Sequence, residues 1–464
     1  MLDSWGKLGA RLFKSSPLVM ADYDECVNVR PESWNFTYAK YCSTSVEVKE
    51  LSGIPLPVPS YQTGVCLPDT CEGPEAQAAI NEFFATLPGT TFVYGGISCK
   101  PQVPMPLTDK AINTIIILSF FALFICIGTL YDVLIVRGYI YELMCQSQDD
   151  SDYDNVPMEE KKPLVEKKES SSPANEHKPG WVGKFFLSFS LRSNGATLLS
   201  TKVNPKTINC INGIRFYSMA WVVLGHHFSG AGNAKTNYGE YQAEKNQQWT
   251  FQALTNALVS VDSFFALSGL LMSYLVFKEL DRTKPKQIPG FLGKFYFHRY
   301  WRLTPPYMLF MLAYVPLIKY MGDGPFWAYE GMEWKECEET WYYNLLYINN
   351  LQPYEKPMCM GWSWYLANDM QFFWVSPFIF MPMYYMRKYF KGILSQTWAF
   401  LWLLFNIIYV GVQSSTTEFG PNGGKDWHKD YYIKPWTRIG PYVVRVYFFE
   451  KVNSFHIICI VRNF

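Results

Sequence analysis

The chain has 464 residues, of which 18% are aromatic and only 17% are charged, and its apolar residues are clustered. The clustering indicates a membrane protein, although the mean hydropathy of -0.05 is that of a soluble chain, because long apolar blocks are averaged with polar ones. The net charge is +1 and no basic stripe is visible, which excludes nucleic acid as a partner.

The first region, residues 1–110, is predicted to be a small exoplasmic domain with disulfides. It contains an N-glycosylation sequon at Asn35. Its cysteines are odd in number, so that one must pair elsewhere, stay free or have lost its partner; they are Cys26, Cys42, Cys66, Cys71 and Cys99. Cysteines and a sequon together indicate an oxidising compartment. Because residues 1–20 lack the apolar segment of a signal peptide, we expect the start to be truncated.

Six segments are predicted to cross the membrane as helices. The first, residues 112–136, carries one charge, Asp132, near its end and is long enough to span an apolar core of about 30 Å. The others are residues 213–228, 251–277, 303–319, 362–385 and 393–413. This pattern predicts an all-α, multi-pass bundle in the plasma membrane or an endomembrane.

The charges of the loops predict the orientation. Lys and Arg gather in the loop 278–302 and the turn 387–391, and such loops are usually cytoplasmic. The loop 320–360 is rich in Asp and Glu, which fits the opposite side. Alternation of six spans then places residues 1–110 outside and residues 137–205 in the cytoplasm.

Two connecting segments have features of their own. Residues 146–179 are hydrophilic and charged, which predicts a disordered cytoplasmic spacer. The acidic exoplasmic loop contains Cys337 and Cys359, and we expect a disulfide between them.

The second span carries ionisable groups where a bilayer makes them costly. Arg215 and His226 are eleven residues apart, so they share one helical face at a separation of about 16 Å. Ionisable groups inside spans usually line a bundle interior, where His226 could serve as a general base. Alternatively, Arg215 and His226 flank the span as anchors at its two interfaces.

Three further charged residues lie in or near the predicted spans. Arg299 and Arg302 could bind the phosphates of an acyl-CoA donor, or could be ordinary cytoplasmic anchors of their span. Asp369 would lie about 10 Å deep in the fifth span, so that it should pair with a buried cation or orient the histidine.

Four blocks in the same order resemble the acyltransferase-3 membrane family. They are the Arg215 to His226 pattern, the segment VDSFFALSG at 261–269, the segment FHRYWRLTP at 297–305, and the segment WSWYLANDMQF at 362–372, where Asp369 replaces the usual Glu. The N-terminal cysteine region, with LDSWGK at 2–7 and YDEC at 23–26, resembles the extra domain of the nose-resistant-to-fluoxetine branch.

The resemblance implies an O-acyltransferase that moves an acyl group, other than aminoacyl, from acyl-CoA to a hydroxyl acceptor. Arg215 and the arginine pair would hold the donor, His226 would deprotonate the acceptor, and Asp369 would support them. No bound cofactor and no metal are expected. The resemblance implies a partial acyltransferase-3 domain at 206–440, a divergent tail at 441–464, and a chain that is incomplete at both ends.

Two other functions remain open. The bundle could transport a lipid or small molecule without chemistry, and Asn212, where many family members have Asp, favours this alternative. The chain could also be a glycosylated binding protein whose outer domain does the work. Incubating labelled acyl-CoA with membranes that contain the full-length protein would distinguish acyl transfer from transport and from binding alone.

The orientation can be tested with protease and sealed vesicles. Because residues 137–205 are predicted to be cytoplasmic, protease should cleave near Lys161 only when it is added to the cytoplasmic side. Cleavage from the lumenal side would show that the orientation is wrong.

Overall fold

The structure is a computed structural model, and it describes most of the chain outside the linker and the C-terminal end. The described residues are 4–6, 18–19, 21–30, 37–51, 54–55, 61–71, 73–85, 90–94, 97–100, 105–136, 179–202, 210–230, 238–327, 331, 334–353, 355–390, 393–416 and 427–454. The chain divides into two compact units, residues 1–106 together with 208–464, and residues 107–207. The predicted disorder at 146–179 lies outside the described residues.

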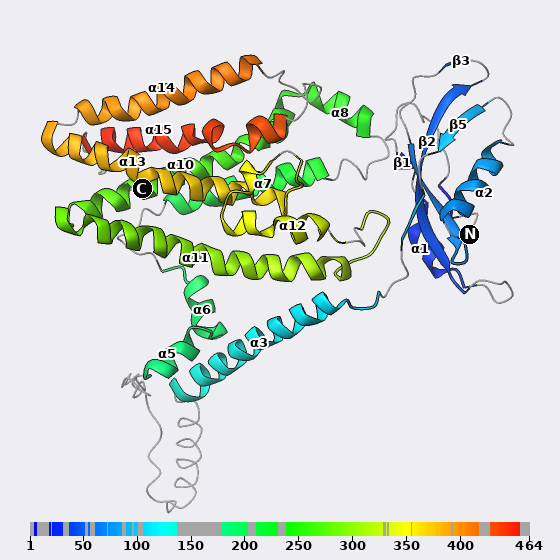
Figure 1. Cartoon of the computed structure of the whole chain (residues 1–464), viewed down its shortest axis with the longest axis horizontal. Helices are drawn as coiled ribbons and strands as arrows, with labels where there is room; N and C mark the ends of the chain where they lie inside the picture. Colours follow the sequence, from blue (N-terminus) through cyan, green and yellow to red (C-terminus); the bar gives the residue numbers. More distant parts are fainter. Residues whose placement is uncertain are drawn as a thin grey trace, which may run out of the picture. The chain divides into compact units, whose positions relative to one another are not determined.

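A six-stranded sheet forms the N-terminal region (Figure 1). Its central strand, β2 (Ala39–Leu51), pairs antiparallel with β4 (Tyr61–Pro68). The smaller elements are β1 (Leu18–Val19), α1 (Tyr23–Asn28), β3 (Ile54–Pro55), α2 (Gly73–Ala85), β5 (Thr90–Tyr94) and β6 (Ser98–Cys99). The predicted all-α class is therefore incomplete, because it omits this sheet. The β-branched residues of β2 alternate with polar ones, which is a strand signal.

Two disulfides stabilise this region, one between a helix and the sheet and one between two strands of the sheet. Cys26 of α1 is joined to Cys66 of β4, and Cys42 of β2 is joined to Cys99 of β6. The remaining cysteine, Cys71, has a free thiol.

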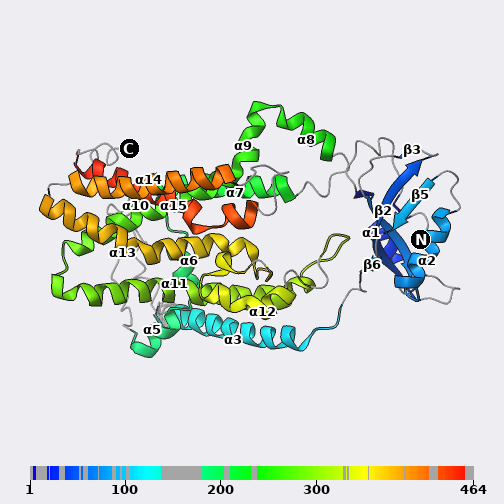
Figure 2. The same ribbon diagram turned by 45° about the horizontal axis from the view of Figure 1, so that its top comes forward.

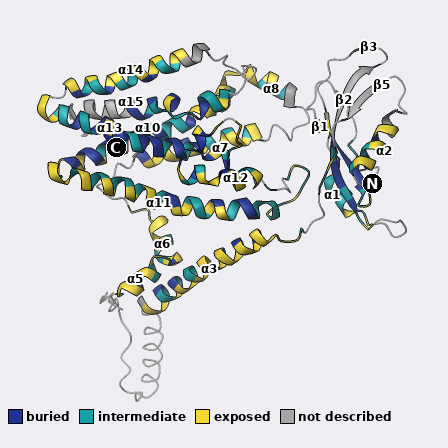
Figure 3. Cartoon of the chain, viewed as in Figure 1, coloured by how far each residue is buried: buried dark blue, intermediate teal, exposed yellow. Residues whose placement is uncertain are grey.

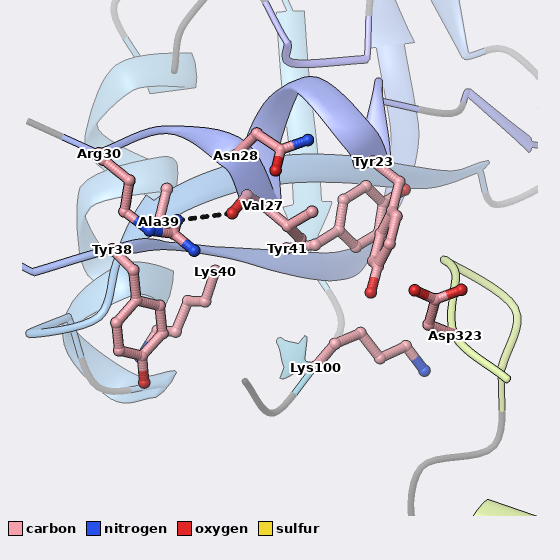
Figure 4. A pocket seen from close by; sticks show the side chains of 10 residues that line it. All are labelled: Tyr23, Val27, Asn28, Arg30, Tyr38, Ala39, Lys40, Tyr41, Lys100 and Asp323. Carbon is pink, nitrogen blue, oxygen red and sulfur yellow. Dashed lines mark hydrogen bonds between the residues drawn. The ribbon is translucent and has the colours of Figure 1, made fainter. Parts of the chain in front are cut away.

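A small cavity of about 200 Å³ lies beside α1 and β2 (Figure 4). The rings of Tyr23 and Tyr41 are 5.4 Å apart at its edge. The guanidinium of Arg30 donates a hydrogen bond of 2.6 Å to the carbonyl of Val27. Burial raises the pKa of the Tyr41 phenol, which therefore stays protonated through the physiological range.

The sequon is described only in part. Asn35 lies outside the described residues, so its glycosylation stays a prediction. Thr37 of the same tripeptide donates its hydroxyl hydrogen to Asp69. This hydrogen bond is the main cause of the lowered pKa of the Asp69 carboxyl.

The second unit contains the first predicted span. It consists of α3 (Asp109–Tyr131), a short π-helix at Asp132–Val136, α5 (Trp181–Leu187) and α6 (Leu191–Leu198). The side chain of Thr108 caps the start of α3 by accepting a hydrogen bond from the Ala111 amide.

The helical bundle belongs to the first unit, and its long helices run side by side in Figures 1 and 2. They are α7 (Cys210–Gly230), α10 (Ser260–Leu280), α11 (Ile288–Leu317), α13 (Trp364–Phe390), α14 (Ile393–Thr416) and α15 (Pro435–Ser454). The shorter helices are α8 (Tyr238–Asn246), α9 (Gln252–Thr255) and α12 (Trp334–Leu345). The helix α15 continues through the predicted domain boundary at residue 440.

All six predicted spans fall on helices of the structure. Three helical segments among the described residues are long and apolar enough to cross a membrane, namely Asp109–Ile135, Trp249–Leu280 and Leu394–Val412. The other three predicted spans lie on α7, α11 and α13, which contain more polar residues and are not among these three apolar segments. Several of these polar residues gather at one site, described below.

Aromatic side chains build the core of the bundle. The ring of Phe265 on α10 stacks on Tyr365 at 4.7 Å and meets Phe372 edge-on at 5.1 Å. Buried residues are concentrated on α10 and α13 (Figure 3). Gly269 lets α15 approach α10 closely, because a Cβ atom there would lie 2.3 Å from the carbonyl oxygen of Tyr442. The signature glycine of the VDSFFALSG segment is thus explained by packing.

A third disulfide joins Cys337 to Cys359 next to the end of α11. The two Cα atoms are 4.4 Å apart, and both side chains are buried near Met311. The bridge encloses the loop between α12 and α13.

Replacing Cys337 and Cys359 together by serine should lower the free energy of unfolding by about 3 kcal/mol, because a loop of this size is no longer closed in the unfolded chain. Thermal unfolding of the purified protein would measure this. Cys126→Ser, which removes an exposed free thiol, is the matched control and should change little. If both variants and the parent had the same melting temperature, a stabilising disulfide between Cys337 and Cys359 would be contradicted.

Candidate functional site

A cavity of about 950 Å³ lies among α10, α11 and α13 and reaches the first turns of α7. Its walls are mostly apolar and aromatic, and its polar groups come from all four helices. The polar and charged lining residues are Arg215, Ser268, Glu279, Lys294, His298, Arg299, Arg302, Tyr365 and Asp369. A large apolar cavity with a few convergent polar groups is the usual form of a small-molecule site.

An ion pair between Arg299 of α11 and Asp369 of α13 forms the centre of this cavity. The other carboxylate oxygen of Asp369 accepts a hydrogen bond of 2.7 Å from Ser268 of α10. The side chains of Arg299 and Asp369 are only 18% and 13% exposed. Charges this far inside a bundle need partners, and here three helices supply them.

Aromatic stacking fixes the guanidinium further. Phe373 lies one helical turn after Asp369 on α13, so both side chains occupy the same face. The guanidinium of Arg299 therefore lies over the Phe373 ring, 4.6 Å from its centre, while it pairs with the carboxylate. Its Nε atom is buried and has no hydrogen-bond partner in the described part of the chain.

A row of basic side chains runs along the same side of α11. Lys294, His298 and Arg302 are spaced by four residues, all three line the cavity, and all three are exposed. Within the described residues, none of the three forms an ion pair. The row therefore presents Lys294 and Arg302, which have no carboxylate partner among the described residues, together with the His298 imidazole to a ligand.

The predicted residues of α7 are separated. Arg215 lines the cavity, but His226 does not. The exposed His226 ring places Nδ1 2.9 Å from the carbonyl oxygen of Val222. Because a carbonyl can only accept, Nδ1 is assigned the hydrogen and Nε2 keeps its lone pair. His227 instead contacts the Phe228 ring edge-on at 6.0 Å.

Four of the predicted site residues therefore meet at one cavity, and the fifth stands apart. The structure brings together Arg215, Arg299, Arg302 and Asp369. Arg299, predicted to hold phosphates with Arg302, has a carboxylate partner, which leaves Arg302 as the freer cation.

Several polar residues of the cavity were missed by sequence reasoning. Lys294 and His298 could have been found because they precede Arg302 by eight and four residues, which places all three on one helical face. Ser268 lies in a recognised segment, but its partner is 101 residues away, and no spacing rule connects them.

A second ion pair joins α10 to α15. Arg438 of α15 contacts Asp262 at 3.0 Å, donates to the carbonyl of Tyr432 at 2.9 Å, and lies over the Tyr432 ring. Asp262 thus binds α10 to α15.

Buried amides connect α13 to the loops beside it. The side chain of Asn350 donates to Asn368 at 2.6 Å, and Gln371 donates to Asn350 at 2.7 Å. Asn368 also donates to the carbonyl of Ile433. This network holds the first turns of α13, and hence Asp369, in place. No cluster of potential metal ligands occurs among the residues that the structure describes.

Comparison with known proteins assigns these features to a family. The model of an acyltransferase domain, acyltransferase-3, matches residues 208–449, and the N-terminal domain model of the nose resistant-to-fluoxetine protein matches residues 1–80. The Caenorhabditis elegans protein "Nose resistant to fluoxetine protein 6" is 32% identical over 326 residues, which are 68% of this chain.

The chain spans about a third of that relative's length, 36%. No solved structure matches the chain. The four sequence blocks, the cavity that they surround and the family matches agree, and the chain belongs to the acyltransferase-3 family, in its nose-resistant-to-fluoxetine branch.

Proposed function

We propose that this bundle transfers an acyl group from acyl-CoA to a hydroxyl acceptor, with the large cavity as the donor site. The observation that carries the proposal is the gathering of Arg215, Arg302 and the Arg299–Asp369 pair around one apolar cavity. Family membership supports acyl transfer, and the basic lining fits a donor that carries phosphates.

The donor would be held by electrostatics. Arg302 and its neighbours in the basic row, Lys294 and His298, are available to phosphate oxygens. Asp369 keeps the Arg299 guanidinium oriented through the ion pair. The apolar walls would exclude water from the thioester, which limits hydrolysis.

His226 would take the proton of the acceptor. Its Nε2 lone pair is available, since Nδ1 bonds to Val222. The long pantetheine arm separates the phosphates of CoA from its thioester, so a separation of about 16 Å along α7 between Arg215 and His226 is compatible with one donor.

In the reaction, the hydroxyl oxygen attacks the thioester carbonyl, a C–O bond forms, and the C–S bond breaks. The hydroxyl proton passes to His226, and the CoA thiolate leaves and is then protonated. No step needs a metal or a redox partner.

A second candidate function is transport of a lipid or small molecule through the same bundle. The position of His226 outside the cavity lining favours it, because a cavity that only binds needs no base. Labelled acyl-CoA incubated with membranes that contain the full-length protein separates the two. Label transferred to a hydroxyl compound supports acyl transfer, and its absence with every donor supports transport.

Neutralising Arg302 should weaken donor binding. Arg302→Gln removes a charge-assisted contact, which corresponds to roughly a tenfold to hundredfold rise in the apparent KM for acyl-CoA. Lys286→Gln is the matched control, because Lys286 is exposed outside the cavity and its loss should leave KM unchanged. An unchanged KM in Arg302→Gln would argue against this placement of the donor.

The histidines should differ sharply. His226→Ala should lower turnover by about 10² to 10⁴-fold, the usual effect of removing a general base, whereas His227→Ala should stay active. The amount of folded protein, measured by size exclusion, must match between variants. If His298→Gln abolishes turnover instead and His226→Ala does not, the base lies in the cavity and the assignment to His226 is wrong.

A further inference from the structure

The two short helices that follow the first span fold back against its end (Figure 1). The ring of Phe124 on α3 stacks with Phe189 at 5.4 Å and with Phe186 at 6.4 Å. Gly183 of α5 permits a close approach, because a Cβ there would lie 2.3 Å from the Tyr131 hydroxyl oxygen. The helix α5 is therefore packed directly on the last turns of α3.

A buried carboxylate fixes α6 at the same place. Asp132, only 1% exposed, follows the last residue of α3 and accepts a 2.6 Å hydrogen bond from the Ser190 hydroxyl. Ser193 donates to the same carboxylate oxygen, and the amide of Leu191 donates to Thr129 at 3.1 Å. These bonds hold the N-terminus of α6 at the end of the span.

The outward faces of α5 and α6 combine large apolar side chains with positive charge. Trp181, Leu198 and Leu199 are 84%, 85% and 81% exposed. The stretch 181–202 contains no Asp or Glu, and its charged residues are Lys184, Arg192 and Lys202, all exposed. Exposed apolar side chains among basic ones are typical of helices that lie in a membrane interface.

Because α3 is one of the segments apolar enough to span a membrane, its end marks the level at which the chain leaves the hydrocarbon. We propose that α5 and α6 lie in the headgroup layer at this level and bind anionic phospholipids. Trp181, Leu198 and Leu199 enter the upper acyl region, and the three basic residues contact lipid phosphates. A basic residue near an anionic surface changes partitioning by about fivefold.

Photocrosslinking of the full chain tests the proposal. Leu198→p-benzoyl-phenylalanine is reconstituted in vesicles that mix phosphatidylcholine and phosphatidylglycerol, illuminated, and analysed by intact mass. The expected adducts are lipids, with phosphatidylglycerol enriched several-fold over its share of the bilayer. Combining Lys184→Gln, Arg192→Gln and Lys202→Gln should return the adducts to the bulk ratio, and so should high salt.

The control removes the same charge elsewhere, with Arg282→Gln, Lys284→Gln and Lys286→Gln, and should keep the enrichment. The reporter at Trp181 repeats the test from α5, in case the Leu198 variant folds poorly. Adducts with protein instead of lipid would show that another part of the chain covers this face. Lipid adducts at the bulk ratio would show that charge plays no role, and either outcome overturns the proposal.

Discussion

The ion pair between Arg299 and Asp369 is the interaction on which the cavity depends. A charge inside a bundle is tolerated only when it is compensated, and Asp369 is compensated by a guanidinium from α11 and by the hydroxyl of Ser268 from α10. Three helices must therefore meet at one point. The apolar walls of the cavity follow from that meeting, and so does the position of the basic row on α11.

Other buried polar contacts hold the surrounding helices in register. Asp262 and Arg438 bind α10 to α15, and Gly269 allows their backbones to approach. The amides of Asn350 and Gln371 hold the start of α13. The helix α10 takes part in both ion pairs, since Asp262 is a partner in one and Ser268 donates a hydrogen bond to Asp369 in the other. Because Asp369 pairs with Arg299, the Arg302 side chain in the same cavity remains available to a ligand.

The sequence predicted the helical segments well because hydropathy is a local property. It predicted the gathering of Arg215, Arg302 and Asp369 only through the order of family motifs, which carry information about distant contacts. Partners such as Ser268 and Arg438 could not be predicted, since pairing across 100 residues or more leaves no spacing signal. The N-terminal sheet was not predicted, although β-branched and polar residues alternate in β2, which is a strand signal.

A double-mutant cycle on Arg299 and Asp369 tests whether this ion pair holds the three helices around the cavity. The free energy of unfolding of the purified chain is measured for Arg299→Gln, Asp369→Asn and the combined variant. Each single change should leave a buried charge without its partner and cost about 3 to 5 kcal/mol. The combined variant should then lose less than the sum, by roughly 0.5 to 3 kcal/mol. Strictly additive losses, or single variants as stable as the parent, would contradict the claim that this pair holds the three helices around the cavity.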